Sequence, residues 1–520
     1  MKRTRVLAAA MAALSLGGSL AGCSSSAVTP TPTPSAPTGE QTAAVQPAQA
    51  PKYVFLFIGD GMSYPQIQST SDFLGALDDE DYWQAQPSLD DNQGAILDGP
   101  EYLNFMNFEA AGSAVTYDSN SFAPDSASTA TSIATGYKTY SGSINVDETG
   151  TISYETIAEK LRDQKDWEIG VITSVNLNHA TPAAFYAHQA SRSSYYEIGL
   201  ELVASDFDYF AGGGLLDPTG SEGDQEDLYA LAAEAGYTVA RTHAEAEAVD
   251  ASTEKALLID EDLADSDAMA YELDRTDDMW SLADYVEKGI EVLDNDTGFF
   301  LMCEGGKIDW ACHANDAAST IHDTKALADA VQVAIDFAAE HPEETLILVT
   351  GDHETGGLTI GFAGTDYDTY LDLLESQKIS FAKYDSDYVA AYKENKTSFE
   401  EVLQDIEELF GLKVQGEEGD KLVLTEYELE QLRAAYEKSV NGTAASEYEQ
   451  EEYVLYGTYE PLSVTITHII NNKSGISFTS YSHTGLPVAV LAEGAGAETF
   501  NGYYDNTQIY HKMADLLDIA

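Results

Sequence analysis

Basic residues are scarce in this chain of 520 residues. It has 25 lysines and arginines against 89 aspartates and glutamates, and its formal net charge is −64 at pH 7. A nucleic-acid-binding protein needs a basic face for the phosphates, so this charge balance excludes such a face. We interpret the acidic residues as a solvated surface that keeps the protein soluble, with adaptation to high salt as the alternative.

Cysteine is almost absent, and long apolar runs are equally rare. Apart from Cys23, the chain has only Cys303 and Cys312. An exported protein could join these two, but nothing in the sequence requires it, and we interpret both as packing residues. After the N-terminal stretch no segment has the ~20 apolar residues that a spanning helix needs, so we expect no further membrane span.

The N-terminal stretch has the features of a bacterial secretion signal. Three of its first five residues are basic, residues 6–20 are mostly apolar, and the sequence LAGC at 20–23 resembles a lipoprotein box. We predict that residues 1–22 are the signal and that Cys23 becomes the lipidated N-terminus. An ordinary cleaved signal with an incidental cysteine is the alternative. The protein would then be exported and lipid-anchored at the extracytoplasmic face of a bacterial membrane.

Residues 23–52 are rich in Ser, Thr, Pro, Ala and Gln and include the run TPTPTP at 29–34. Such a composition cannot bury a core. We predict an extended tether that holds a catalytic domain, residues 53–520, away from the membrane.

The catalytic domain alternates apolar runs with helical patterns, which predicts an α/β fold with a central, mostly parallel sheet flanked by helices. The runs at 53–58, 299–303 and 346–349 are continuous, as in strands that are buried on both faces. Another strand is predicted at 488–491 and a helical tail at 511–519.

The composition changes between about 365 and 460. This segment is acidic and helical, with two capping-box patterns at 398–401 and 425–428. We predict an inserted helical subdomain that covers one flank of the sheet. A role at the mouth of the site or in an interface is left open.

Five short clusters carry the chemistry, and most of them follow an apolar run: Asp60, Asp125 with Ser126, Glu304 with Asp309 and His313, Asp352 with His353, and His483. A parallel sheet gathers the carboxyl ends of its strands at one edge. Carboxylates and imidazoles gathered there suit divalent metals, and a serine among them suits a metal-activated nucleophile.

Each cluster is ambiguous when it is taken alone. Ser126 could simply be an N-cap, and Asp309 with His313, four residues apart on one helix face, could be a surface hydrogen bond. Together they predict metal-assisted hydrolysis of a phosphate ester.

The same residues lie in stretches that resemble the alkaline phosphatase family, in the order found there: 58–62 (IGDGM), 125–128 (DSAS), 180–183 (ATPA), 191–192 (SR), 304–309 (EGGKID), 352–357 (DHETGG) and 483–485 (HTG). The resemblance spans roughly residues 53–360 and 476–520. It implies a phosphomonoester hydrolase that acts on small substrates through a phosphoserine on Ser126.

The resemblance also implies two zinc ions and one magnesium ion per chain, with the following ligands: Asp309, His313 and His483 for the first zinc; Asp60, Asp352, His353 and the Ser126 oxygen for the second; Asp60, Thr181 and Glu304 for magnesium. Arg192 would clamp two phosphate oxygens, and Asp125 would orient it. A homodimer is left open, as is the natural substrate.

One position departs from the family pattern. His179 stands where many bacterial members place an aspartate that serves the magnesium site, and imidazole is a poor partner for a hard ion. His179 is therefore a second-shell candidate that leaves the third metal's identity and affinity open, with zinc as an alternative. Trp310 is predicted to line the substrate mouth, or else simply to pack its helix.

Two other functions compete with this one. A related phosphodiesterase or a sulfatase is the nearer, although a sulfatase should show Cys-x-Pro-x-Arg at its nucleophile. A surface protein that binds only structural metal is the more distant, because structural zinc sites are usually rich in cysteine.

Overall fold

The computed structural model describes residues 50–79, 97–443 and 449–520. The predicted signal, Cys23 and the tether up to residue 49 lie outside these ranges. Within them, no helix combines the length and apolar character needed to cross a bilayer.

A sheet of ten strands forms the centre of the fold, in the order β14-β2-β13-β8-β1-β7-β3-β4-β6-β5. All neighbouring strands pair in parallel except β13, which is antiparallel to both β2 and β8. The prediction of a mostly parallel sheet is therefore confirmed. The strands are β1 (Tyr53–Gly59), β2 (Ala110–Val115), β3 (Glu168–Thr173), β4 (Tyr209–Gly212), β5 (Thr238–Ala240), β6 (Ala256–Ile259), β7 (Phe299–Gly305), β8 (Thr345–Gly351), β13 (Val488–Gly494) and β14 (Gly502–Asp505).

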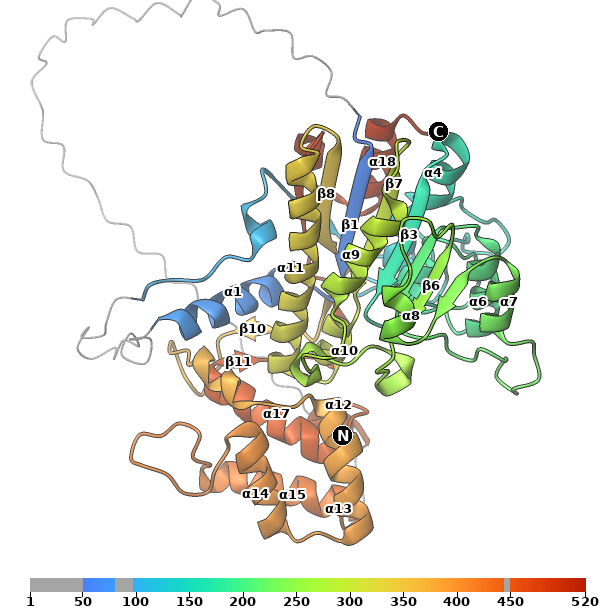
Figure 1. The fold of residues 1–520 in the computed structure, drawn as a ribbon. Coiled ribbons are helices and arrows are strands. Elements are labelled where there is room, and N and C mark those ends of the chain that lie inside the picture. Colours follow the sequence, from blue (N-terminus) through green and yellow to red (C-terminus); the bar gives the residue numbers. More distant parts are fainter. Residues whose placement is uncertain (1–49, 80–96, 444–448) are drawn as a thin grey trace, which may run out of the picture. The chain divides into compact units, whose positions relative to one another are not determined.

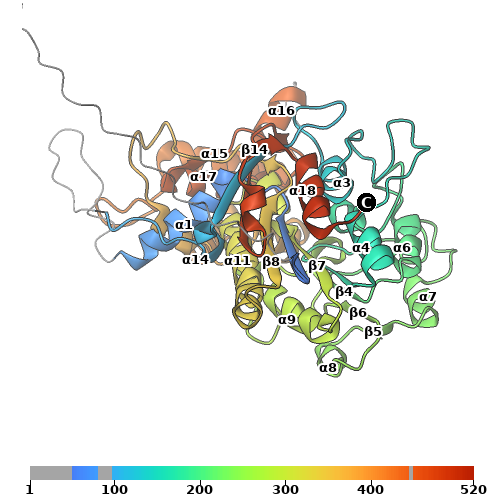
Figure 2. The ribbon, with the colours of Figure 1, turned by 90° about the horizontal axis from the view of Figure 1, so that it is seen from above.

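Helices cover both faces of the sheet, which explains why the central strands are apolar throughout. Alternate residues of β1 enter two different cores: Val54, Leu56 and Ile58 enter one, and Tyr53, Phe55 and Phe57 the other. The helices on the first face are α3 (Ser126–Thr135), α4 (Ile157–Lys165), α5 (Ala180–Ala183), α6 (Tyr195–Ala204), α7 (Leu228–Glu234) and α18 (Thr507–Leu517). Those on the second are α1 (Tyr64–Asp78), α8 (His243–Glu247), α9 (Leu282–Leu293) and α11 (Ala317–Glu340). Figure 2 shows α18 and α4 on the side of the sheet opposite to α9 and α11.

The segment between β10 (Thr359–Ile360) and β11 (Ile476–Ser477) is helical, as the sequence predicts. Its helices are α12 (Phe381–Lys383), α13 (Ala390–Asn395), α14 (Phe399–Phe410), α15 (Glu426–Ser439), α16 (Glu449–Tyr456) and α17 (Pro461–Ser474). Of these, α13, α14, α15 and α17 share a core with parts of α1 and α11, and α17 belongs to it although it lies beyond residue 460. Figure 1 shows α13, α14, α15 and α17 next to one another. Both predicted capping boxes are present, at Ser398 and Thr425.

The other local predictions differ little from the structure. The helix expected after Asp309 already begins at Lys307, as α10 (Lys307–His313), and the tail helix α18 begins earlier than residue 511. Cys303 and Cys312 are buried and unbonded, which agrees with their interpretation as packing residues.

Candidate functional site: a three-cluster metal centre

Three central strands end in register and so bring the acidic residues together. Gly59 at the end of β1 pairs with Gly305 of β7 and with Gly351 of β8, so Asp60 and Asp352 leave the sheet side by side. A side-chain carbon at Gly351 would lie 1.9 Å from the Met62 carbonyl oxygen, so only glycine permits this close approach.

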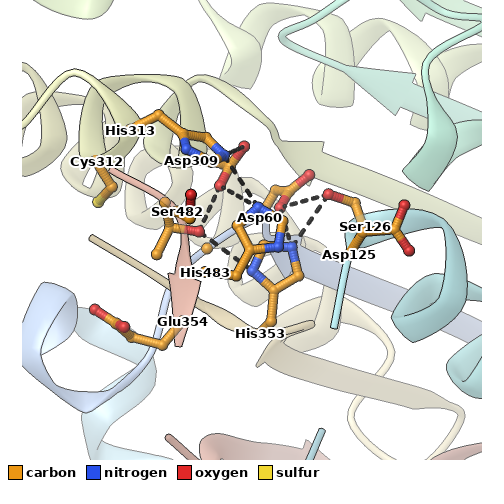
Figure 3. A network of polar contacts seen from close by, with 12 residues as sticks. Asp60, Asp125, Ser126, Asp309, Cys312, His313, His353, Glu354, Ser482 and His483 are labelled. Atoms are coloured by element: carbon orange, nitrogen blue, oxygen red, sulfur yellow. Dashed lines mark hydrogen bonds and ion pairs between the residues drawn. The ribbon is translucent and has the colours of Figure 1, made fainter. Parts of the chain in front are cut away.

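The first cluster consists of Asp309, His313 and His483 (Figure 3). Asp309 and His313 lie one turn apart on α10, and His483 comes from β12 (His483–Thr484), which pairs with β9 (Glu354–Thr355). The two imidazole Nε2 atoms are 3.0 Å apart, and each lies about 3.4–3.5 Å from an Asp309 oxygen. These three side chains therefore point at one place.

Both histidines of this cluster are oriented by backbone carbonyls. His313 Nδ1 lies 2.6 Å from the Tyr481 carbonyl oxygen, and His483 Nδ1 lies 2.5 Å from that of Pro124. In the neutral form, an imidazole that donates from Nδ1 leaves Nε2 unprotonated, which is the tautomer a metal ion needs.

The second cluster consists of Asp60, Asp352 and His353, all buried. His353 Nε2 lies 3.2 Å from Asp60 and 3.4 Å from Asp352. Ser126, the first residue of α3, places its Oγ 3.1 Å from His353 Nε2 and 3.3 Å from Asp60 Oδ1 (Figure 3). Its hydroxyl therefore lies beside two ligand side chains and at a helix N-terminus, where an anionic oxygen is favoured.

The third cluster consists of Asp60, His179 and Glu304. Thr181 donates to Asp60 Oδ2 at 3.2 Å, and Thr173 donates to Glu304. His179, which the sequence places in a second shell, lies within ligand range here. Two buried atoms, Glu304 Oε1 and His179 Nδ1, lack a hydrogen-bond partner among the described residues, as expected at a site that takes an ion.

Arg192 lies against the same groups. Its Nη1 donates to Asp125 at 2.9 Å, and its Nη2 lies 3.0 Å from His179 Nε2. Asp125 also caps α3 by accepting the Ser128 backbone N–H. One carboxylate thus fixes both the guanidinium and the helix that begins with Ser126.

Three carboxyl groups of the second and third clusters are costly to ionise without a cation. Burial raises the pKa of Asp60 well above its usual range, and the Asp352 carboxylate raises it further. Burial also raises the pKa of Asp352 to about 6 and that of Glu304 to about 8. Bound divalent cations would reverse these shifts, so the residues present fit metal ions.

Ser126 and the first cluster face a cavity of about 360 Å³. Ser126, His179, Arg192 and the first cluster line one part of it, and Trp310, predicted for the substrate mouth, also lines it. Five further lining residues were missed by the sequence analysis: Asp265, Ser266, Tyr271, Phe381 and Tyr459. No motif or spacing marks them, because they come from loops and from the helical insert, whose docking the sequence does not reveal.

Comparison with known proteins identifies the family of the chain. The family described as alkaline phosphatase matches residues 51–519. Alkaline phosphatases 3 and 4 of Bacillus subtilis (strain 168) are 30% and 29% identical to the chain, over 88% and 87% of it and 87% and 86% of their own lengths.

Solved structures give the same result. A cold-active alkaline phosphatase from a psychrophilic Shewanella species superposes with a TM-score of 0.68 and 28% identity, over 89% of this chain and 99% of that one. The alkaline phosphatase of the Antarctic bacterium TAB5 superposes with a TM-score of 0.59 and 25% identity, over 91% and 99%. Variants of the TAB5 enzyme in which a histidine is replaced by glutamate or aspartate have Mg bound in a site called M3. On sequence, fold and site together, the chain belongs to the alkaline phosphatase family of phosphomonoester hydrolases.

Proposed function

We propose that this chain hydrolyses small phosphomonoesters in a metal-dependent reaction that passes through a phosphoserine on Ser126. The observation that carries the proposal is the position of the Ser126 hydroxyl. It is buried, lies at the start of α3, and is within 3.3 Å of both Asp60 and His353.

Three ions would be held by the three clusters. Asp309, His313 and His483 offer two nitrogens and a carboxylate, and Asp60, Asp352 and His353 offer two carboxylates and a nitrogen, sets that suit zinc. The oxygen-rich third cluster, with Thr181 nearby, suits magnesium. When bound, such ions lower the pKa of the serine hydroxyl and of water and neutralise the charge that develops on phosphate oxygens.

The residues of the chain account for the remaining steps. Arg192, held by Asp125, donates two hydrogen bonds to non-bridging oxygens of the phosphate. Ser126 Oγ, as the alkoxide, forms a bond to phosphorus while the bond to the leaving oxygen breaks on the opposite side. Water then attacks the phosphoserine from the side that the alcohol has vacated, and inorganic phosphate leaves as the serine oxygen is released.

The third ion is the least constrained part of the proposal. His179 lies among its ligands, where a carboxylate would serve magnesium better. The TAB5 variants that replace a histidine by an acid and hold Mg in M3 support this view. We propose that the third ion exchanges faster than the two zincs, and that zinc competes for its place.

The N-terminal sequence supports a proposal for the location of the protein. We propose that Cys23 is lipidated and anchors the protein to the extracytoplasmic face of a bacterial membrane, with residues 23–52 as the tether. Incorporation of labelled fatty acid into the wild type but not into Cys23→Ala is the expected result. A homodimer is left open, and light scattering of a protein that comprises residues 53–520 measures the assembly.

One set of assays tests the activity. The purified protein should hydrolyse a phosphomonoester far faster than a phosphodiester or a sulfate ester, and a chelator should abolish the reaction. Labelled phosphate trapped at low pH should map to Ser126. Faster turnover of the diester or the sulfate ester would show that the proposed function is wrong.

A further inference from the structure

The cavity at Ser126 is larger than a phosphate group requires. Its volume of about 360 Å³ lies in the range of sites that enclose whole small molecules, roughly 300–1,000 Å³. Beyond the residues that would hold the phosphate, its lining consists of four aromatic side chains, one carboxylate and one hydroxyl: Tyr271, Trp310, Phe381, Tyr459, Asp265 and Ser266. This second part of the cavity is called the aromatic wall below.

The aromatic wall is built jointly by the catalytic domain and the insert. Tyr271 and Phe381 meet edge to face with ring centroids 5.7 Å apart, and Phe381 meets Tyr459 in the same way at 5.8 Å. Tyr271 and Phe381 are buried by these contacts, whereas Tyr459 and Trp310 remain half-buried at the cavity. The half-buried rings are therefore the ones that offer surface to a ligand.

A cation is fixed behind this wall. Lys307 is fully buried, and its Nζ lies 2.8 Å from Asp265, 3.9 Å from the centre of the Tyr271 ring and 4.8 Å from that of Trp310. It neutralises Asp265 and already occupies the cation-binding faces of two rings. Among the lining residues that the structure describes, Arg192 is the only lysine or arginine, so the wall offers no place for a second phosphate.

Polar groups are also present at the wall. The Tyr271 hydroxyl is buried and has no hydrogen-bond partner among the described residues, and the Ser266 side chain lines the cavity beside Asp265. Asp265 retains 38% of its side-chain exposure despite its ion pair, and a carboxylate there can accept from sugar hydroxyls.

We propose that the aromatic wall is a leaving-group subsite for a planar aromatic ring that is joined to the phosphate by a short polar linker, as in a nucleoside 5′-monophosphate. The inference rests on the proposed function, because it takes the phosphate to lie at Ser126 and Arg192. Aromatic rings stack flat or edge-on against aromatic side chains, and hydroxyls of the linker can form hydrogen bonds with the polar groups at the wall.

Pairs of substrates isolate the contribution of the ring. Adenosine 5′-monophosphate and ribose 5-phosphate share the sugar phosphate and differ by the base. The pair 2-phenylethyl phosphate and 2-cyclohexylethyl phosphate tests a ring without ribose, with leaving groups of matched basicity. We expect kcat/KM to be about tenfold higher for the nucleotide than for the sugar phosphate, mostly through KM. If the phenyl compound is also preferred over its cyclohexyl partner, the subsite accepts aromatic rings in general. If only the nucleotide is preferred over its partner, the subsite is specific for nucleosides.

Two tyrosines of the insert provide a matched pair of variants. Tyr459 and Tyr453 both contact the ring of Tyr481, each at 6.3 Å, but only Tyr459 lines the cavity. Tyr459→Leu should remove most of the tenfold preference while leaving kcat/KM for ribose 5-phosphate within about twofold of the wild type. Tyr453→Leu should leave both values unchanged. Circular dichroism and metal content should match the wild type in both variants.

The outcomes separate this inference from the function on which it rests. If the wild type hydrolyses both members of each pair equally well, or if Tyr459→Leu keeps the preference, the subsite is wrong and the phosphomonoesterase stands. If the wild type hydrolyses none of the four substrates but does cleave a diester, the proposed function itself is wrong.

Discussion

The sheet edge and the helical insert contribute to the same cavity by opposite means. At the sheet edge, Asp60, Glu304, Asp352 and His353 are fully buried ionisable groups, held by strands that end in register. The insert instead buries apolar residues in a core that it shares with α1 and α11, leaves its acids mostly exposed, and contributes to the cavity only the rings of Phe381 and Tyr459.

The sheet edge would therefore carry out the reaction, and the rings of the insert would select the substrate. Burying ionisable groups costs folding free energy unless bound cations compensate their charge. The sheet edge therefore lowers the stability of the metal-free protein. Aromatic rings at the cavity cost little folding free energy, and they can be substituted without replacing a metal ligand. The two regions still touch at Tyr481, whose carbonyl orients His313 and whose ring packs on Tyr459.

The largest effect is expected at the sheet edge, from Ser126→Ala. Removing the nucleophile should lower kcat by at least about 10³-fold and leave zinc content and thermal unfolding nearly unchanged. Ser132→Ala, in the same buried helix, is the control, because the Ser132 hydroxyl only donates within α3. Substantial activity in Ser126→Ala would show that the reaction needs no covalent step.

Removal of the metal ions should sharpen the contrast between the regions. A dialysed, chelator-treated protein should lose activity and several kcal/mol of stability, on the order of 4 kcal/mol for an ion at 1,000 times its Kd. Hydrogen exchange should accelerate in the loops after β1, β7 and β8 but not in α14 and α15. Equal acceleration in both regions would mean that the insert depends on the metal centre for its fold.

A smaller effect is expected from His179→Asp. The added carboxylate should tighten magnesium at the third cluster by about tenfold, because magnesium prefers oxygen ligands and anionic acceptors for its waters. Metal content after dialysis and the magnesium dependence of turnover measure it. His179→Gln removes the imidazole without adding charge and should bind magnesium no more tightly than the wild type. Equal magnesium affinity in His179→Asp and wild type would show that His179 does not contribute to the third metal site.

The sequence predicted the sheet edge far better than the insert's contribution. Strand ends converge in any parallel sheet, so Asp60, Glu304 and Asp352 could be placed together from apolar runs alone. The grouping of His179 with Asp60 and Glu304 needed three-dimensional information, because α5 must turn back onto the sheet.

The insert shows where sequence reasoning ends. Amphipathic patterns and capping boxes predict its helices, and the structure contains them. They do not say where the helices dock, so nothing in the sequence placed Phe381 or Tyr459 at the cavity. Likewise, Lys307 lies in a family motif, yet its partner Asp265 is 42 residues away and is identified only by the fold.

The smallest expected effect tests whether the insert is energetically independent. Ser398 caps α14: it accepts the Glu401 N–H at 3.4 Å, and its own N–H donates to the Glu401 carboxylate at 3.1 Å. Ser398→Ala should lower the stability of the insert by about 1 kcal/mol, because one N–H at the start of α14 loses its partner. Gln404→Ala, at an exposed position of the same helix, should be nearly neutral. Hydrogen exchange of α14 measures the loss, and kcat/KM for ribose 5-phosphate should not change in either variant. A parallel loss of turnover in Ser398→Ala would show that the insert helps to hold the metal ligands, with the Tyr481 carbonyl on His313 as the connection.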